Sequence, residues 1–309
     1  MNLGKLLKTI AIAGASGTIG RALEKFLTEK GDSVKRLVRR SEIDNSEIFW
    51  DPNNDDLDPS RLIGVDAVVN LAGAGIGDKR WSQKRMDQII NSRVKSTKLI
   101  SETISELKSE NGPNVLVNAS AIGYYGNSGS THVTEEAEQG EGFLAHVCSN
   151  WEKSTQEAEK AGIRVVHART GVVLSSSGGL LKKLLPLFKL GLGGQIGSGK
   201  QMMSWISLRD EISAINWMIE KEIEGAVNLV SPEPASNLEF TKTLGALLKR
   251  PTILKVPNSA LNLLYGRQLV EEIMLSSQFV VPKKLQDTTF SFRDASLEEA
   301  LLHQISSKS

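Results

Sequence analysis

A glycine-rich turn near the amino terminus constrains the fold of this chain most strongly. A β-branched, apolar run, Thr9 to Ala13, leads into Gly14-Ala-Ser-Gly17-Thr-Ile-Gly20, and an amphipathic helical pattern follows. A strand, a tight turn and a helix start in this order form the geometry that binds a dinucleotide pyrophosphate. Gly14 permits the turn, Gly17 lets backbone N–H groups approach the phosphates, and Gly20 lets the helix pack on the strand. The other residues of this turn that we expect to contact the nucleotide are Ser16, Thr18 and Ile19.

Two arginines stand at the end of the next predicted strand and indicate which nucleotide binds. An NAD-binding protein places Asp or Glu about 20 residues after the glycines, where the carboxylate accepts hydrogen bonds from the ribose 2′-OH. This chain has Arg39 and Arg40 there. Guanidinium groups suit a 2′-phosphate, which a carboxylate would repel. The pair therefore predicts NADP(H), although two arginines at a strand end are also compatible with a solvated surface.

A third strand, Asp66 to Gly73, ends in small residues. Short side chains at the carboxyl end of a parallel strand let a cofactor lie against the backbone in the sheet crevice. We therefore expect Leu71, Ala72 and Gly73 to line the cofactor. The alternative is an ordinary core strand followed by a glycine turn.

Strand-like and helix-like segments alternate through the first half of the chain, which predicts an α/β fold with a Rossmann-type, doubly wound parallel sheet. The pattern changes after Thr170, so we expect a nucleotide-binding domain at 1–170 and a smaller substrate-binding part at 171–309, with the chain crossing between them. The predicted strands lie near 9–13, 34–38, 47–50, 66–71, 114–120, 164–168 and 228–231, and the predicted helices near 18–30, 83–110, 142–162, 180–190 and 237–249, the last capped by Asn237.

Composition excludes several other classes of function. The formal net charge is +1 and aromatic residues make up 5% of the chain, so neither charge nor stacking favours a nucleic-acid partner. No apolar run approaches the ~18 residues of a membrane span, and the run before the glycine turn is too short for a signal peptide. The single cysteine, Cys148, permits no intrachain disulfide, and the four scattered histidines predict no metal site. A cytoplasmic protein is expected, as a monomer or a homodimer.

Taken together, the motifs resemble the extended, atypical short-chain dehydrogenase/reductase superfamily. Within it they are similar to the epimerase-like family of human SDR39U1-type and bacterial YfcH-type proteins, which has a DUF1731-like carboxyl-terminal region. The resemblance implies NADP(H) bound by a Rossmann-type domain, and a cleft for a small carbonyl or sugar-like substrate. By position, it places Asp51 near the adenine and makes Gln88 and Arg93 face the cofactor. The segments that carry the match are Gly14–Gly20, Trp50–Pro52, Asn70–Gly73, Arg80–Trp81, Ser92–Val94, Arg169–Leu174, Phe188–Gly199, Ser204–Ile206, Ser231–Pro232 and the tail from Val256.

The superfamily's catalytic motif does not carry over. Its Tyr-x-x-x-Lys occurs nowhere in this chain, and the nearest alignment puts Val147 and Trp151 at those two positions. In that superfamily the lysine lowers the tyrosine pKa so that the tyrosine can act as general acid and base. Here the substitutes that could act on a substrate are Tyr124, Tyr125 and Ser120.

Two functions therefore stay open at this point. The chain could be an NADP(H)-dependent oxidoreductase or epimerase whose acid/base group is unusual for its superfamily. Alternatively, it could be a non-catalytic NADP(H)-binding regulatory or scaffold protein. The resemblance adds a link to cell division to that second reading, because plant and cyanobacterial relatives are associated with cell or plastid division.

Overall fold

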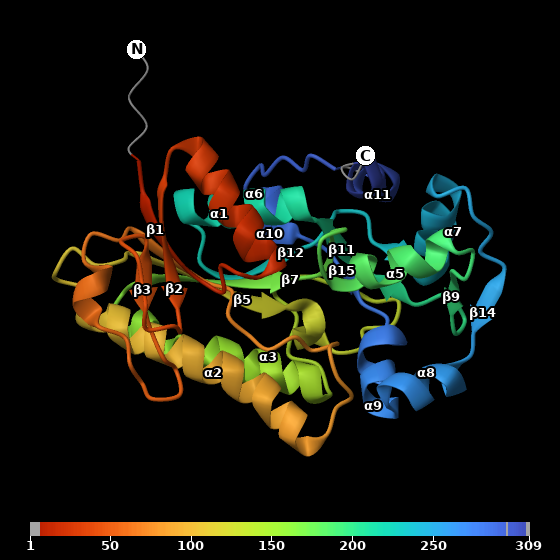
Figure 1. Ribbon diagram of the computed structural model, residues 1–309, viewed down its shortest axis with the longest axis horizontal. Coiled ribbons are helices and arrows are strands. Elements are labelled where there is room, and N and C mark those ends of the chain that lie inside the picture. The colour runs from red at the N-terminus through yellow and green to blue at the C-terminus, as the bar shows by residue number, and fades with distance from the viewer. Residues whose placement is uncertain (1–6, 295, 307–309) are drawn as a thin grey trace, which may run out of the picture.

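A seven-stranded parallel sheet forms the centre of the molecule in this computed structural model, which describes residues 7–294 and 296–306 (Figure 1). The outermost ends of the two predicted domains, residues 1–6 and 307–309, lie outside the described residues. The strands of this sheet are β1 (Thr9–Ala13), β2 (Ser33–Val38), β3 (Glu47–Phe49), β4 (Ala67–Asn70), β5 (Val115–Ala121), β7 (Arg164–Thr170) and β12 (Gly225–Leu229). Their order across the sheet is β12-β7-β5-β4-β1-β2-β3, and each neighbouring pair is parallel. The predicted Rossmann-type sheet is confirmed.

Helices cover both faces of this sheet (Figure 1). Because successive side chains of a strand point to opposite faces, Ile10 and Ile12 belong to one buried cluster and Ala11 and Ala13 to the other. The first cluster is closed by α1 (Thr18–Lys30) and α6 (Leu208–Glu220), and the second by α2 (Gln83–Glu106) and α4 (Gln156–Lys160). The other helices of the first half are η1 (Pro59–Leu62), η2 (Ile122–Tyr125) and α3 (Phe143–Lys153).

Two predicted helices differ in detail from the observed ones. The helix expected over 142–162 is interrupted after Lys153, where the Thr155 hydroxyl donates to the Glu152 carbonyl oxygen (2.7 Å). A hydroxyl that bonds nearby backbone in this way competes with the regular helical pattern. Asn237 is not the cap of its helix: Ser236 is the cap, and it forms a reciprocal capping box with Glu239.

The carboxyl-terminal half adds short elements around a smaller third cluster, which includes Trp205, Phe240 and Leu301. This half also supplies β12 to the main sheet and α6 to one of its faces, so the chain crosses back into the first domain. The division at residue 170 stays a prediction. Among the described residues, no helix has both the length and the apolar character needed to cross a bilayer. The remaining elements are β6 (His132–Val133), β8 (Val172–Leu174), α5 (Gly179–Lys189), β9 (Gly194–Ile196), β10 (Met202–Met203), β11 (Trp205–Ser207), β13 (Ala235–Ser236), α7 (Asn237–Leu247), β14 (Leu254–Val256), α8 (Asn258–Tyr265), α9 (Arg267–Leu269), η3 (Val270–Met274), β15 (Phe279–Val280), α10 (Lys283–Asp287) and α11 (Leu297–Ser306).

Candidate functional site

The glycine turn lies where the strand order of the sheet reverses, between β1 and β4. In open α/β sheets, ligands bind outside the carboxyl ends of the strands at such a switch point. Gly14 has φ of +80°, and a Cβ there would lie 2.7 Å from the Leu71 carbonyl carbon. A Cβ at Gly20 would overlap the Gly14 carbonyl oxygen. The packing of α1 and β4 against the turn therefore requires glycine at both positions.

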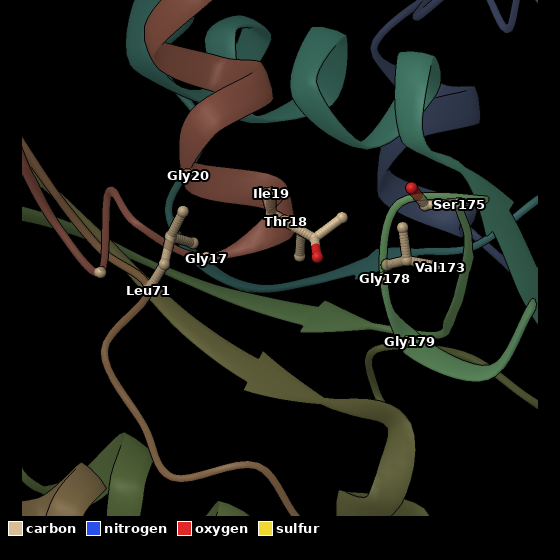
Figure 2. Close-up of a pocket in the computed structure, with 10 residues that line it drawn as sticks. Gly17, Thr18, Ile19, Gly20, Leu71, Val173, Ser175, Gly178 and Gly179 are labelled. Atoms are coloured by element: carbon tan, nitrogen blue, oxygen red, sulfur yellow. The ribbon is translucent and has the colours of Figure 1, made fainter. Parts of the chain in front are cut away.

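The amino-terminal end of α1 carries no side-chain cap, because its cap residue is Gly17. Uncapped N–H groups at a helix start favour an anion. The turn and the start of α1 line a pocket of about 230 Å³, which Figure 2 shows between Gly17 to Gly20 on one side and Val173 to Gly179 on the other. Thr18, Ile19 and Gly20 lie in this pocket, as do Gly14, Gly17 and Leu71.

A larger cavity, of about 1450 Å³, continues from the turn along α2 and past the ends of β2 and β3. Its volume exceeds the roughly 300–1,000 Å³ of pockets for drug-sized ligands and suits an elongated ligand such as a dinucleotide. The cavity does not include Asp51 or Arg93 in its lining, although it includes neighbours of both. The residues predicted from the sequence that it brings together are Gly14, Ser16, Gly17, Arg39, Arg40, Leu71, Ala72, Gly73 and Gln88.

The two predicted 2′-phosphate residues are in different electrostatic situations. Arg40 makes a two-point ion pair with the buried Glu47, with 2.8 Å between Nη1 and Oε2, and Arg36 approaches the same carboxylate at 3.1 Å. Arg39 is exposed, and it makes no ion pair or hydrogen bond with a described residue. Of Arg36, Arg39 and Arg40, Arg39 is therefore the one whose guanidinium is free to bind a ligand.

The predicted adenine-side residue, Asp51, is engaged within its own turn. It accepts hydrogen bonds from the Asn53 backbone N–H (3.0 Å) and the Asn54 side-chain amide (2.8 Å). These bonds lower the pKa of Asp51, and the charges of Arg39 and Lys95 act in the same direction. The Asp51 side chain therefore shapes the loop beside the cavity, and the adenine contact stays a prediction.

A buried ion pair, Glu152 with Arg169, lies at the carboxyl ends of β5 and β7. Both guanidinium–carboxylate contacts, Nε to Oε1 and Nη2 to Oε2, measure 2.8 Å. The Ser120 hydroxyl donates to Glu152 (2.6 Å), and Arg169 donates to the Tyr125 hydroxyl oxygen (2.9 Å). Tyr125 in turn donates to the side-chain oxygen of Asn228 (2.7 Å). Every member is less than 10% exposed, so the network is satisfied internally.

The three residues predicted to act on a substrate therefore differ in availability. Ser120 and Tyr125 are buried within the network, and burial raises the pKa of Tyr125 to about 12. Tyr124 is partly buried, and its hydroxyl makes no hydrogen bond with a described residue. The Arg169 guanidinium carbon lies 3.5 Å from the centre of the Tyr124 ring, a cation–π contact that fixes the ring. Their catalytic roles stay predictions, and the geometry favours Tyr124.

The positions aligned with the superfamily's tyrosine and lysine, Val147 and Trp151, are both buried on α3. The Trp151 indole N–H donates to the Thr97 hydroxyl (2.9 Å). Next to them, burial raises the pKa of the Cys148 thiol to about 11, so this group stays neutral. In place of an acid/base pair, this part of α3 contributes packing.

Sequence reasoning missed the network as a unit. Glu152, Arg169 and Asn228 lie on different elements, and no local spacing joins them. The one available signal was Arg169 itself, a charged and buried residue near the carboxyl end of β7. No cluster of three or more His, Cys, Asp or Glu that could hold a metal exists among residues 7–294 and 296–306.

Comparison with known proteins gives matches over nearly the whole chain. Residues 10–229 match the NAD dependent epimerase/dehydratase family, and residues 256–304 match a domain of unknown function, DUF1731. The epimerase family protein Mb2239 of Mycobacterium bovis is 42% identical over 293 residues, which cover 94% of this chain and 96% of that protein. The crystal structure of human epimerase family protein SDR39U1 with NADPH has a TM-score of 0.88 and 31% identity, covering 96% of this chain and 99% of that one. A nucleoside-diphosphate sugar epimerase from Corynebacterium glutamicum has a TM-score of 0.80 and 34% identity, with 97% of this chain and 58% of that chain covered.

Proposed function

Because this chain belongs to the NAD dependent epimerase/dehydratase family and carries a DUF1731 domain, we propose that it is an NADP(H)-dependent oxidoreductase. Its substrate would be a small carbonyl or sugar-like compound. The observation that carries the proposal is that one long cavity is lined both by the glycine turn, where α1 starts without a side-chain cap, and by the unpaired Arg39 after β2. The NADPH in the human SDR39U1 structure is a further reason to expect the phosphorylated cofactor here.

The residues present fit a dinucleotide in three places. The start of α1 and the glycine turn would hold the pyrophosphate, and Leu71 to Gly73 would lie along the cofactor. Arg39 would bind the 2′-phosphate, while Arg40 and Arg36 would neutralise Glu47, which would otherwise repel it. Arg36 also pairs with Asp44 and Glu24, so Arg39 is the guanidinium in this cluster that no ion pair with a described residue occupies.

The chemistry that NADPH supplies is hydride transfer to a carbonyl carbon, which yields an alcohol and NADP⁺ once the oxygen takes up a proton. We assign that proton to the Tyr124 hydroxyl, because Tyr124 is the one of the two neighbouring tyrosines whose hydroxyl has no partner among the described residues. Ser120 and Tyr125 would act as positioning residues through Glu152 and Arg169.

A matched pair of tyrosine variants tests this assignment. Tyr124→Phe should lower the turnover number by about 10²–10⁴-fold, because it removes the proton donor, and should leave NADPH affinity unchanged. Tyr125→Phe should instead cost about 1–3 kcal/mol of stability, because Arg169 and Asn228 lose a buried partner. The measurements are NADPH oxidation against a panel of aldehydes, ketones and keto sugars, and urea unfolding. Unchanged turnover in Tyr124→Phe would show that another group donates the proton.

A second function is favoured by the loss of acid/base groups on α3. Val147 and Trp151 pack, Cys148 is neutral and buried, and two of the three candidate hydroxyls belong to an internal network. This second function is that of a non-catalytic NADP(H)-binding regulatory protein, which would keep the cofactor site and lack turnover. The family resemblance would connect such a protein to cell division. NADPH binding without oxidation of NADPH by any compound of the panel would favour this function over the first.

A further inference from the structure

The guanidinium of Arg93 projects from α2 into the region beside the end of β4. Its Nη1 donates to the carbonyl oxygens of Ala74 (3.0 Å) and Ile89 (3.1 Å), and its Cζ lies 4.9 Å from the centre of the Trp151 ring. A Cβ at Gly73 would lie 3.1 Å from that Cζ, so the absence of a side chain at Gly73 makes room for the guanidinium. The Arg93 guanidinium is therefore held by hydrogen bonds from Nη1 and by the contact of its flat face with the Trp151 ring.

No acidic side chain that the structure describes neutralises this cation. Among the described residues, Arg93 has no carboxylate within ion-pair distance, and its Nε and Nη2 make no hydrogen bond. The titratable groups that act on it are Cys148, which is neutral, and Arg85, which is also positive. Burial lowers the pKa of Arg93 to about 10, so the group remains charged at neutral pH. A charged group that is largely removed from water is stable when an anion pairs with it.

Arg93 lies beside the β4 side of the cavity that also holds Arg39 and the glycine turn: its neighbours Gly73, Ala74 and Ser92 line that cavity, although Arg93 itself does not. Arg39 follows β2, the glycine turn follows β1, and Gly73 follows β4, in that order across the sheet. A dinucleotide with its 2′-phosphate at Arg39 and its pyrophosphate at the glycine turn would therefore extend its other end toward β4. Arg93 lies on that side, between Gly73 and the α3 residue Trp151. An anion at Arg93 would then belong to a molecule next to the reacting end of the cofactor.

We propose that Arg93 binds a carboxylate of the substrate, so that the substrate class is an oxo acid or hydroxy acid. The Nε–Nη2 edge of a guanidinium matches the two oxygens of a carboxylate, and Nη1 is already held by two backbone carbonyls. Arg85, anchored on the Gly75 carbonyl oxygen, adds positive charge to the same region. This inference rests on the proposed function for the position of the cofactor.

Arginine-selective ¹⁵N NMR tests the site without requiring turnover. The Nε–H signal of Arg93 is identified by its absence from Arg93→Lys, and NADP⁺-loaded protein is titrated with pyruvate, with acetone and with inorganic phosphate. Pyruvate should shift this signal saturably, while acetone, which has the carbonyl but no carboxylate, should not. Pyruvate affinity should fall about tenfold or more in Arg93→Met and less in Arg93→Lys, which keeps the charge. Lys98→Met removes an exposed cation from the same helix and should leave the titration unchanged.

Three results would overturn the inference. In the first, pyruvate does not shift the Arg93 Nε–H signal, and in the second, only phosphate shifts it. In the third, Arg93→Met loses as much NADPH affinity as Arg39→Ala does. The third result would give Arg93 to the cofactor, as the family resemblance implies. Failure of the wild-type protein to bind NADPH would instead refute the proposed function, and the pyruvate titration of the cofactor-free protein would still test Arg93.

Discussion

Replacing Glu152 with alanine should lower the free energy of unfolding by about 3–5 kcal/mol. Arg169 is 4% exposed, and Glu152 is its only carboxylate partner among the described residues. Without that carboxylate, a charge would remain buried, and Ser120 would lose its acceptor. Urea unfolding followed by circular dichroism measures the change.

Two controls make this result specific to the buried pair. Glu157→Ala removes an exposed carboxylate paired with Lys160 and should change stability by no more than about 0.5 kcal/mol. The double variant Glu152→Leu with Arg169→Met should recover much of the loss, because it removes both charges. A loss below about 1 kcal/mol in Glu152→Ala would mean that Arg169 reaches water or another anion.

Replacing Arg39 with alanine should weaken NADPH binding by about 10–100-fold, the equivalent of one or two charge-assisted hydrogen bonds to the 2′-phosphate. NADH affinity should stay unchanged, since that cofactor has a hydroxyl at the same place. Arg40→Ala is the matched control: Arg40 is already paired with Glu47, so its loss should weaken NADPH less. Isothermal titration of each variant with both cofactors measures the selectivity. A parallel loss for both cofactors would place Arg39 away from the 2′-phosphate.

The central sheet could be predicted from the sequence because its signals are local. The strand over 9–13 and the helix over 18–30 match β1 and α1 at both ends. The small two-stranded sheets could not be predicted, because their strands are remote in sequence: β9 pairs with β14, and β6 of the first half pairs with β15 of the second. The pairing of β12 with β7 also depends on how β12 packs against α6. The spacing of residues within β12 does not predict that packing.

The same difference holds for the candidate site. The glycine turn and Arg39 form one short segment, so a strand, a turn and a charge at the right separation were enough to predict them. The Glu152–Arg169 network joins four separate segments and could be found only from coordinates. Likewise, the sequence predicts that both Arg39 and Arg40 face a ligand, and only the structure distinguishes them, because it pairs Arg40 with Glu47.

The most direct test of the account is calorimetric titration of the purified wild-type protein with NADPH and then with NADH. The arrangement of the glycine turn, the long cavity and Arg39 predicts one saturable site, with NADPH bound about 10–100-fold more tightly than NADH. Equal affinity for the two cofactors would contradict the 2′-phosphate assignment. Binding of neither would contradict the central claim that this is an NADP(H)-binding protein.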